Sequence, residues 1–278
     1  MDIKEILKNK LSEKELASLK TGYDIIGDIA IMEIPEKLKK RQRDIANAVL
    51  EVNRHVRLVC KKASKRKGRL RLREIQTVLS RDSKSTETVH REYGCLFKLD
   101  VAKAYFSPRE STERQRIASQ VKPKEAVMVM FAGVGAYAIV IGKKQPAVNM
   151  IYAIELNKSA CEYMRENVKL NRLNYKIVSI QGDVKNKSKP YYGKCDRVAM
   201  PLPKSGYKYL QYGIKCLKKH GTIHFYDICS EKELFTKSIS ILDNECKKLK
   251  RKVKIFNKRT VLPYGPRIWK VCIDAKMI

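Results

Sequence analysis

Histidine and tryptophan are scarce in this 278-residue sequence, and no long apolar run interrupts it. Only four His and one Trp occur, and none of the eight Cys stands in a C-x-x-C pair, so the ligand spacings of a structural zinc site are missing. No segment approaches the roughly 20 apolar residues of a membrane-spanning helix. With 13 Gly, 9 Pro and 44% hydrophobic residues, the chain does not resemble a collagenous or disordered protein. The sequence predicts a globular protein with reduced cysteines in its core, no bound metal and no membrane partner.

Acidic residues are also few, and the resulting positive charge is the strongest feature of the composition. The chain has 60 Lys and Arg against 29 Asp and Glu, a formal net charge of +31. This excess favours binding to RNA or DNA, although solvated lysine faces or an anionic membrane surface would also fit. The N-terminal residues MDIKEILKNKLSEKEL lack the apolar segment of a signal peptide. We therefore expect a nucleic-acid-binding protein of the cytoplasm.

Residues 1–100 predict a small α+β domain. Residues 3–20 have the spacing of one charged helix, and the apolar segment 25–34 predicts one strand. A second helix is expected from Pro35 through Leu50. Short strands are expected near residues 54–60, 86–94 and 95–101, with a basic loop at 61–74.

Residues 101–278 follow another pattern, in which apolar strands alternate with helices. Strands are expected at 126–131, 150–156, 176–183, 196–203 and 222–228, with helices at 158–171, 206–219 and 231–250. This alternation predicts a parallel sheet with right-handed crossovers. Two last strands, near 252–260 and 269–276, are close enough in sequence to form an antiparallel hairpin. The predicted fold class is α/β, a Rossmann-like domain with a mostly parallel seven-stranded sheet, preceded by the small α+β domain.

A cofactor site is expected where the first strand of this sheet turns into a helix. Glycines in the segment FAGVG would let a ligand approach the backbone and the helix N-terminus. Glu155, ending the second strand, is suited to bind ribose hydroxyls, and Asp183, after the third, to bind an adenine amino group. No Walker lysine follows the glycines, which disfavours an ATP-type loop, whereas NAD stays open. The expected nucleoside-binding residues are Phe131, Ala132, Gly133, Gly135, Glu155 and Asp183.

Several segments together resemble the archaeal and eukaryotic tRNA (guanine-37, N1)-methyltransferase family. They include TVHREYGCLFKLDVAKAYFSPRESTERQRIA (88–118), FAGVG (131–135), RLRE (71–74), DRVAMPLPKSGYKYL (196–210) and YGPRIWKVCID (264–274). The resemblance implies a class I methyltransferase domain that uses S-adenosylmethionine. A small RNA-contacting domain would precede it along the chain. It also implies a tRNA partner, contacted in its anticodon region.

The same resemblance implies roles for individual residues. Glu113 would be the general base that removes the proton of guanine N1, Arg109 would order the site, and Arg73 would face guanine O6. A carboxylate base opposite an arginine suits this acceptor, because N1 is a poor nucleophile until its proton leaves and O6 takes up charge. Taken alone, Arg109 and Glu113 have the spacing of an i,i+4 surface ion pair. The residues expected to contact the substrate are Tyr105, Arg114, Pro201 and Pro203.

Two positions depart from the family pattern. Val129 stands where the family usually has aspartate, so one polar contact to the cofactor is missing. Pro201, in the motif MPLP, stands where the commonest form has an asparagine that contacts the target base, and proline has no amide to replace it. The MPLP form resembles the archaeal subgroup that also methylates C7 of 4-demethylwyosine, the tricyclic wyosine precursor.

The expected function is methyl transfer from S-adenosylmethionine to N1 of guanine 37 in tRNA, and to C7 of 4-demethylwyosine at the same position. One alternative is transfer of the aminocarboxypropyl group from the same cofactor, against which Glu113 argues. Another is a catalytically silent tRNA-binding factor, which Val129 would favour if it prevented cofactor binding. The basic segment from Lys61 to Arg73, with Arg114 and Arg116, is expected to border the RNA-binding cleft.

Overall fold

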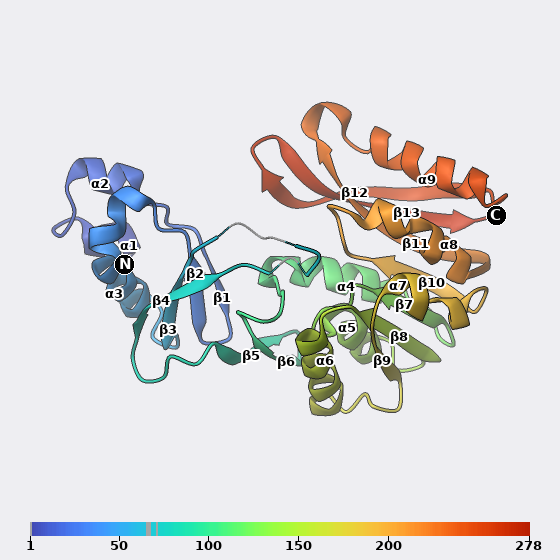
Figure 1. Ribbon diagram of the computed structural model, residues 1–278, viewed down its shortest axis with the longest axis horizontal. Coiled ribbons are helices and arrows are strands. Elements are labelled where there is room, and N and C mark those ends of the chain that lie inside the picture. Colours follow the sequence, from blue (N-terminus) through green and yellow to red (C-terminus); the bar gives the residue numbers. More distant parts are fainter. Residues whose placement is uncertain (1, 65–67, 71) are drawn as a thin grey trace. The chain divides into compact units, whose positions relative to one another are not determined.

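The computed structural model describes residues 2–64, 68–70 and 72–278. The chain forms two compact units, residues 1–108 and 109–278 (Figure 1). The boundary expected from the sequence lies at residue 100, whereas the first unit also includes the segment that leads into the 3₁₀ turn η2 (Pro108–Glu110). Within the described part of the chain, no helix combines the length and the apolar character needed to cross a bilayer.

The first unit is an α+β domain with a mixed four-stranded sheet and a separate hairpin. The sheet has the order β1-β2-β3-β4, in which only β2 and β3 run parallel, and β5 pairs with β6 alone. Apolar residues of α1, α3 and the sheet form its core. Its elements are α1 (Ile3–Leu7), α2 (Glu13–Ser18), β1 (Tyr23–Ile26), β2 (Ile29–Met32), η1 (Glu36–Arg41), α3 (Gln42–Val52), β3 (Leu58–Lys62), β4 (Ile75–Ser80), β5 (Glu87–Glu92) and β6 (Cys95–Asp100).

The single helix expected over residues 3–20 is wrong, because two capping boxes divide it. Asp2 caps α1 together with Glu5, and Ser12 caps α2 together with Glu15. In each box the capping side chain accepts from the backbone N–H of the glutamate, whose carboxylate accepts in return from the backbone N–H of the cap. The second box starts a new helix within a segment whose apolar spacing looks continuous.

The single strand expected over residues 25–34 is also wrong, because the chain reverses at Gly27 between β1 and β2. Gly27 has a φ of +58°, and an added Cβ would lie 2.0 Å from Oγ1 of Thr88 in β5. Its backbone N–H donates to Nδ1 of His90, at 3.1 Å. The turn therefore requires glycine for both its conformation and its close approach to β5. Strand β4 follows the basic loop expected at 61–74, in a segment for which the sequence predicted no element.

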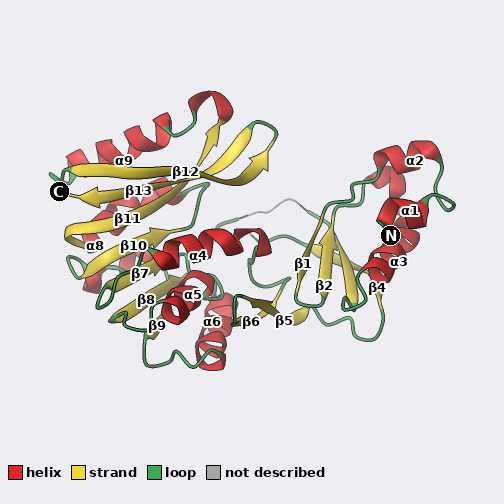
Figure 2. Ribbon diagram, turned by 180° about the vertical axis from the view of Figure 1, so that it is seen from behind, coloured by secondary structure: helices red, strands yellow, loops and turns green. Residues whose placement is uncertain are grey.

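The second unit confirms the α/β fold and the seven strands. The sheet has the order β12-β13-β11-β10-β7-β8-β9, parallel from β11 to β9, with an antiparallel edge formed by β13 and β12. Helices α4, α5 and α6 cover one face, and α8 and α9 cover the other (Figure 2). The elements are α4 (Ser111–Ser119), β7 (Ala126–Met130), α5 (Ala136–Lys144), β8 (Met150–Glu155), α6 (Lys158–Leu170), β9 (Ile177–Gln181), α7 (Val184–Lys187), η3 (Lys189–Tyr191), β10 (Cys195–Met200), η4 (Gly206–Tyr209), α8 (Leu210–Cys216), β11 (Leu217–Ser230), η5 (Glu231–Glu233), α9 (Thr236–Lys248), β12 (Val253–Gly265) and β13 (Ile268–Met277).

The two faces of β11 and β13 differ in character. Alternate residues, Ile223 and Phe225 in β11 and Ile273 and Ala275 in β13, belong to the apolar cluster with residues of α8 and α9. The intervening residues point to the opposite face, because side chains alternate along a strand. They form a buried polar layer against α4, made of His224, Tyr226, Lys270, Cys272 and Asp274, each at most 2% exposed. All eight cysteines are free and buried, as the sequence predicts.

Asp274 is the centre of this polar layer. Its carboxylate accepts from Arg116 Nη1 at 2.5 Å, from Asn257 Nδ2 at 2.8 Å and from His224 Nδ1 at 2.7 Å. Burial opposes ionisation of Asp274, but these donors outweigh it and hold its pKa below the usual range. Arg197 Nη1 lies 2.7 Å from Nε2 of His224. Burial lowers the pKa of His224, so the neutral ring donates from Nδ1 and accepts at Nε2.

We predict that replacing this histidine makes stability less dependent on pH. Because the pKa of His224 is below its ordinary value of about 6.5, unfolding takes up a proton as the pH falls below that value. Its contribution is therefore fully present above about pH 6.5 and decreases at lower pH. His224→Gln should lower the free energy of unfolding at pH 7.5 and flatten its pH dependence by at most about 1.4 kcal/mol per pH unit.

Denaturant unfolding of both proteins between pH 7.5 and pH 5 measures this difference. The other three of the four histidines are present in both proteins, so the comparison isolates His224. Equal slopes for the two proteins would contradict the assignment.

Candidate active site

Four loops meet at one edge of the seven-stranded sheet. Strands β10, β7, β8 and β9 are parallel neighbours, so their carboxyl ends lie side by side. The segments that follow these strands carry most of the residues expected to bind a cofactor, together with Pro201. Open α/β sheets bind ligands outside these strand ends. The topology thus brings together residues from distant parts of the sequence, such as Phe131 and Pro201, which are 70 positions apart.

The glycine loop after β7 leads into α5 through three left-handed backbone conformations. Phe131, Gly133 and Gly135 all have positive φ, of 59°, 58° and 89°. Gly135 is the N-cap of α5, where a Cβ would lie 2.9 Å from Cγ of Met164. Glycine is required there for its conformation and for close packing against α6.

Glu155 lies against this loop, as the sequence predicts. Its Oε2 accepts from the backbone N–H of Gly133 at 2.7 Å, and its Oε1 accepts from that of Asn157 at 2.7 Å. Burial raises the pKa of Glu155, although these two hydrogen bonds act in the opposite direction. Each carboxylate oxygen retains acceptor capacity for a hydroxyl. The pair therefore fits the ribose-binding role that the spacing suggests.

Asp183 and the two prolines occupy the neighbouring loops. Asp183 caps α7 by accepting from the backbone N–H of Lys185 at 2.9 Å. The preceding Gly182 donates to the backbone oxygen of Glu155 at 2.8 Å, which fixes the Asp183 loop beside the end of β8. Pro201 is half-buried directly after β10, and Pro203 is buried. Val129 is 0% exposed within β7, so its side chain belongs to the core of the domain.

Glu113 lies in α4 and is buried in the polar layer. Its Oε1 accepts from Tyr226 Oη at 2.6 Å and from Arg116 Nη2 at 2.7 Å. Its Oε2 accepts from Arg116 Nε at 2.8 Å. The side chain of Glu113 is 3% exposed, whereas Arg109 is exposed in η2. Glu113 therefore does not form a surface ion pair with Arg109.

A second buried pair lies one turn before Glu113. Lys270 Nζ is 2.7 Å from Glu110 Oε2 and 4.8 Å from the ring centroid of Tyr226. No motif in the sequence pointed to Tyr226, Lys270 or Asp274 as parts of the site, and Arg116 was expected at the RNA-binding cleft instead. Their pattern was present in the sequence, because polar residues alternate with apolar ones along β11 and β13.

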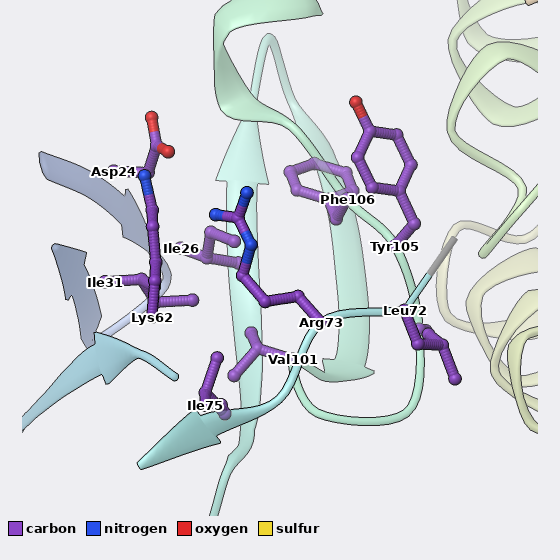
Figure 3. Close-up of a pocket in the computed structure, with 11 residues that line it drawn as sticks. Asp24, Ile26, Ile31, Lys62, Leu72, Arg73, Ile75, Val101, Tyr105 and Phe106 are labelled. Atoms are coloured by element: carbon purple, nitrogen blue, oxygen red, sulfur yellow. The ribbon is translucent and has the colours of Figure 1, made fainter. Parts of the chain in front are cut away.

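The expected substrate residues Arg73 and Tyr105 belong to the first unit. They line a pocket with Asp24, Lys62 and Phe106, among others. In Figure 3 the side chains of Asp24, Lys62, Arg73 and Tyr105 point toward the same end of this pocket. Two cationic groups, one acid and an aromatic ring thus share one concave surface.

The arginines expected at the RNA-binding cleft are not exposed cations. Arg114 is 2% exposed, and the side chain of Arg116 is 14% exposed and bonded to Glu113 and Asp274. Their burial does not support the prediction that they contact RNA phosphates. In the basic segment from Lys61 to Arg73, residues 65–67 and 71 lie outside the described residues. Arg69 and Gly68 are exposed.

One group of side chains has the composition of a metal site. The ligand atoms of His224, Cys272 and Asp274 lie within 4.8 Å of one another. However, the guanidinium groups of Arg116 and Arg197 are bonded to Asp274 and His224. Their positive charge opposes a cation at this position, so we assign the group a structural role.

Comparison with protein families decides the relationship that the motifs suggest. Residues 88–255 match the TRM5/TYW2 methyltransferase domain. The chain belongs to this family. Residues 3–82 match the TYW2 N-terminal domain, so both units of the chain have counterparts among TRM5/TYW2 proteins.

Curated relatives in the TRM5/TYW2 family have several related activities. The chain is 39% identical over 259 residues to tRNA (guanine(37)-N(1))-methyltransferase Trm5b of Pyrococcus abyssi, covering 93% of this chain and 76% of that protein. It is 31% identical to tRNA (guanine(37)-N(1))/4-demethylwyosine(37)-methyltransferase Taw22 of Nanoarchaeum equitans, covering 92% and 100%. It is 38% identical over 193 residues to tRNA(Phe) (4-demethylwyosine(37)-C(7)) aminocarboxypropyltransferase of Methanocaldococcus jannaschii, covering 69% and 76%.

Solved structures of TRM5/TYW2 proteins have the same fold. The complex of aTrm5 and tRNALeu superposes with a TM-score of 0.87 at 32% identity, covering 99% of this chain and 78% of that one. The structure of M. jannaschii TYW2 in complex with AdoMet gives a TM-score of 0.73 at 30% identity, covering 92% and 99%.

The packing of Gly135 yields a stability prediction. Gly135→Ala should lower the free energy of unfolding by roughly 2–4 kcal/mol, because it adds a clash with Met164 to the strain of a positive φ. Gly193→Ala is the matched control, since Gly193 has a φ of +69° but no atom within 4 Å of an added Cβ. Denaturant unfolding should show a smaller loss, about 1 kcal/mol, for the control. Equal losses would contradict the packing role.

Proposed function

We propose that the protein is a tRNA methyltransferase that transfers a methyl group from S-adenosylmethionine to N1 of guanine 37, and to C7 of 4-demethylwyosine at the same position. The observation that carries the proposal is the pairing of Glu155 with the Gly133 backbone at the sheet edge, within a family whose relatives have these two activities. The net charge of +31 suits a tRNA substrate. Related proteins have been solved with tRNALeu and with AdoMet.

The residues at the sheet edge fit a sulfonium nucleoside cofactor. Glu155 offers carboxylate oxygens for the ribose hydroxyls, and Asp183 offers an acceptor for the adenine amino group. The left-handed residues Phe131, Gly133 and Gly135 lead into the N-terminus of α5, next to the buried Ala132, and a helix N-terminus is a favourable place for a polar ligand. When bound, S-adenosylmethionine supplies an electrophilic methyl group. Val129 is buried in the core, so its difference from aspartate leaves the Glu155 and Gly133 contacts in place.

Glu113 is the proposed general base. Its carboxylate is buried and held by Arg116 and Tyr226, so its orientation is fixed before the substrate arrives. A fixed carboxylate can remove the N1 proton as charge develops on O6 of the same ring. We propose that Arg73 neutralises this charge, and that Tyr105 stacks on the flipped base. Arg109, Arg114, Pro201 and Pro203 are proposed to shape the surrounding pocket.

We predict that Glu113→Gln slows methylation of N1 by about 100-fold or more, the scale expected for a positioned general base. The amide keeps the shape of the carboxylate but cannot take the proton. Single-turnover transfer of labelled methyl to a tRNA transcript with G37 measures the rate. Binding of S-adenosylmethionine and tRNA should stay within about threefold, and a near-normal rate would show that Glu113 is only structural.

Pro201 bears on the choice of target base. It follows β10 directly, and the backbone N–H of Leu202 donates to the oxygen of Met200 at 2.8 Å, which forms a tight turn there. Proline provides no side-chain amide for the guanine edge. Recognition that depends on Arg73, Glu113 and stacking by Tyr105 does not require a bicyclic base, so the tricyclic precursor also fits this scheme.

We predict that Pro201→Asn shifts the enzyme toward guanine. The side-chain amide of the added asparagine can hydrogen-bond to the edge of guanine. Against the tricyclic precursor the same amide would remain unpaired. The ratio of rates on G37 tRNA and on 4-demethylwyosine tRNA should rise by roughly 10-fold. Nucleoside analysis of both products measures this ratio. Absence of any wild-type product from the tricyclic tRNA would exclude the second activity and leave N1 methylation untouched.

A second candidate is aminocarboxypropyl transfer from the same cofactor. The match of residues 3–82 to the TYW2 N-terminal domain and the 38% identity to an aminocarboxypropyltransferase favour it. The buried, oriented Glu113 favours methyl transfer, because base removal of a proton is the step that N1 methylation needs. The mass of the modified nucleoside distinguishes the two groups.

A further inference from the structure

The carboxylate of Glu113 has one acceptor position left. A carboxylate accepts about four hydrogen bonds, two at each oxygen. Among the described residues, Oε1 accepts from Tyr226 and Arg116 at 2.6 and 2.7 Å, whereas Oε2 accepts only from Arg116, at 2.8 Å. Oε2 is therefore the oxygen that can receive a proton.

Arg259 approaches this same oxygen from β12. Its Nε lies 3.8 Å from Glu113 Oε2, beyond hydrogen-bond range. The side chain of Arg259 is 46% exposed, compared with 14% for Arg116. Exposed ion pairs contribute little to stability, so the fold does not explain this position. Within residues 2–64, 68–70 and 72–278, Arg259 makes no shorter side-chain contact to an acid.

A β-bulge directs Arg259 toward Glu113. Val253 and Ile255 pack on the apolar cluster, opposite Met277 and Ala275 of β13. The register then shifts between Ile255 and Asn257, so that Asn257 and Arg259 pair with Asp274 and Cys272 of the polar layer. One extra residue in a strand turns the following side chains to the other face.

We propose that Arg259 is a substrate-contacting residue of the methyl-transfer reaction, and that its guanidinium holds an oxygen of the acceptor nucleotide that carries negative charge. The inference rests on the proposed function, with Glu113 as the base. It adds a cation from the edge strand of the sheet to the proposed set.

The movement of charge during the reaction explains why a cation is needed at this position. The N1–H bond breaks and an O–H bond forms on Oε2, so Glu113 becomes neutral. The electron pair left on the base is shared by N1 and O6 until N1 bonds to the methyl carbon and the carbon–sulfur bond breaks. Arg259 is half-exposed and not hydrogen-bonded to Glu113, so it is free to follow this charge from Oε2 to the nucleotide. A phosphate oxygen of the same nucleotide offers the same chemistry.

Three variants test the inference: Arg259→Ala, Arg259→Lys and the control Lys258→Ala. Lys258 is the adjacent cation, but it pairs with Ile273 and lies over the Phe235 ring, at 6.0 Å, on the apolar-cluster side. Single-turnover methylation of G37 tRNA and tRNA affinity at several salt concentrations are measured for each protein. Thermal unfolding should be unchanged, because both side chains are exposed or half-exposed.

We expect Arg259→Ala to lower the rate divided by the tRNA dissociation constant by about 10- to 100-fold. Arg259→Lys should recover part of this loss, and Lys258→Ala should stay within about twofold of wild type. A loss in rate at saturating tRNA identifies O6 as the partner. A loss in affinity, with the salt slope reduced by about one, identifies a phosphate.

Other outcomes overturn the inference. Equal effects of Arg259→Ala and Lys258→Ala would show that only total charge matters. A faster Arg259→Ala enzyme would show that Arg259 merely masks Glu113. If the wild type transfers no methyl to G37, the proposed function fails together with the inference; an active wild type with an unaffected Arg259→Ala variant overturns the inference alone.

Discussion

The buried arginine between two acids is the interaction on which the second unit depends. Arg116 bonds Glu113 on its own helix and Asp274 on β13. Three charges out of water are costly unless every one is paired and hydrogen-bonded. Helix α4 therefore cannot slide or rotate on the sheet without exposing an unpaired charge, and this fixes the position of Glu113 relative to β11 and β13.

The same sheet uses two different means to position its functional groups. At the carboxyl ends of the parallel strands, the backbone fixes the position of Glu155. The adjacent loop contains three left-handed residues, and two backbone N–H groups donate to the carboxylate of Glu155. Across β11 and β13, charged and hydrogen-bonding side chains position the functional groups instead. The layer of side chains under α4 is polar, whereas the layer on the opposite face of the sheet is apolar. The proposed cofactor site and the proposed base thus belong to one domain but are held in place by separate interactions.

Much of this arrangement can be predicted from the sequence, and the failures have physical reasons. The alternation of apolar strands with helices predicted the seven strands of the second unit. It could do so because parallel strands that are buried on both faces are nearly continuous apolar segments. The spacing from Gly135 to Glu155 indicated a meeting of loops, which the 2.7 Å contact to Gly133 confirms. Apolar spacing could not reveal the second capping box at Ser12 or the turn at Gly27, since both are encoded by one or two polar or small residues. Nor could it reveal the partners of Glu113, because Tyr226 and Asp274 come from strands more than 100 residues away.

The bulge in β12 changes the face of the sheet to which its side chains point. Before the bulge, Val253 and Ile255 pack on the apolar cluster. After the bulge, Asn257 and Arg259 lie opposite Asp274 and Cys272 of the polar layer. If the same sequence ran on as a regular ladder from Ile255, Phe256 would stand opposite Asp274 and Asn257 opposite Ile273. Arg259 would then point away from the polar layer, so the one extra residue lets a single strand contribute to both layers.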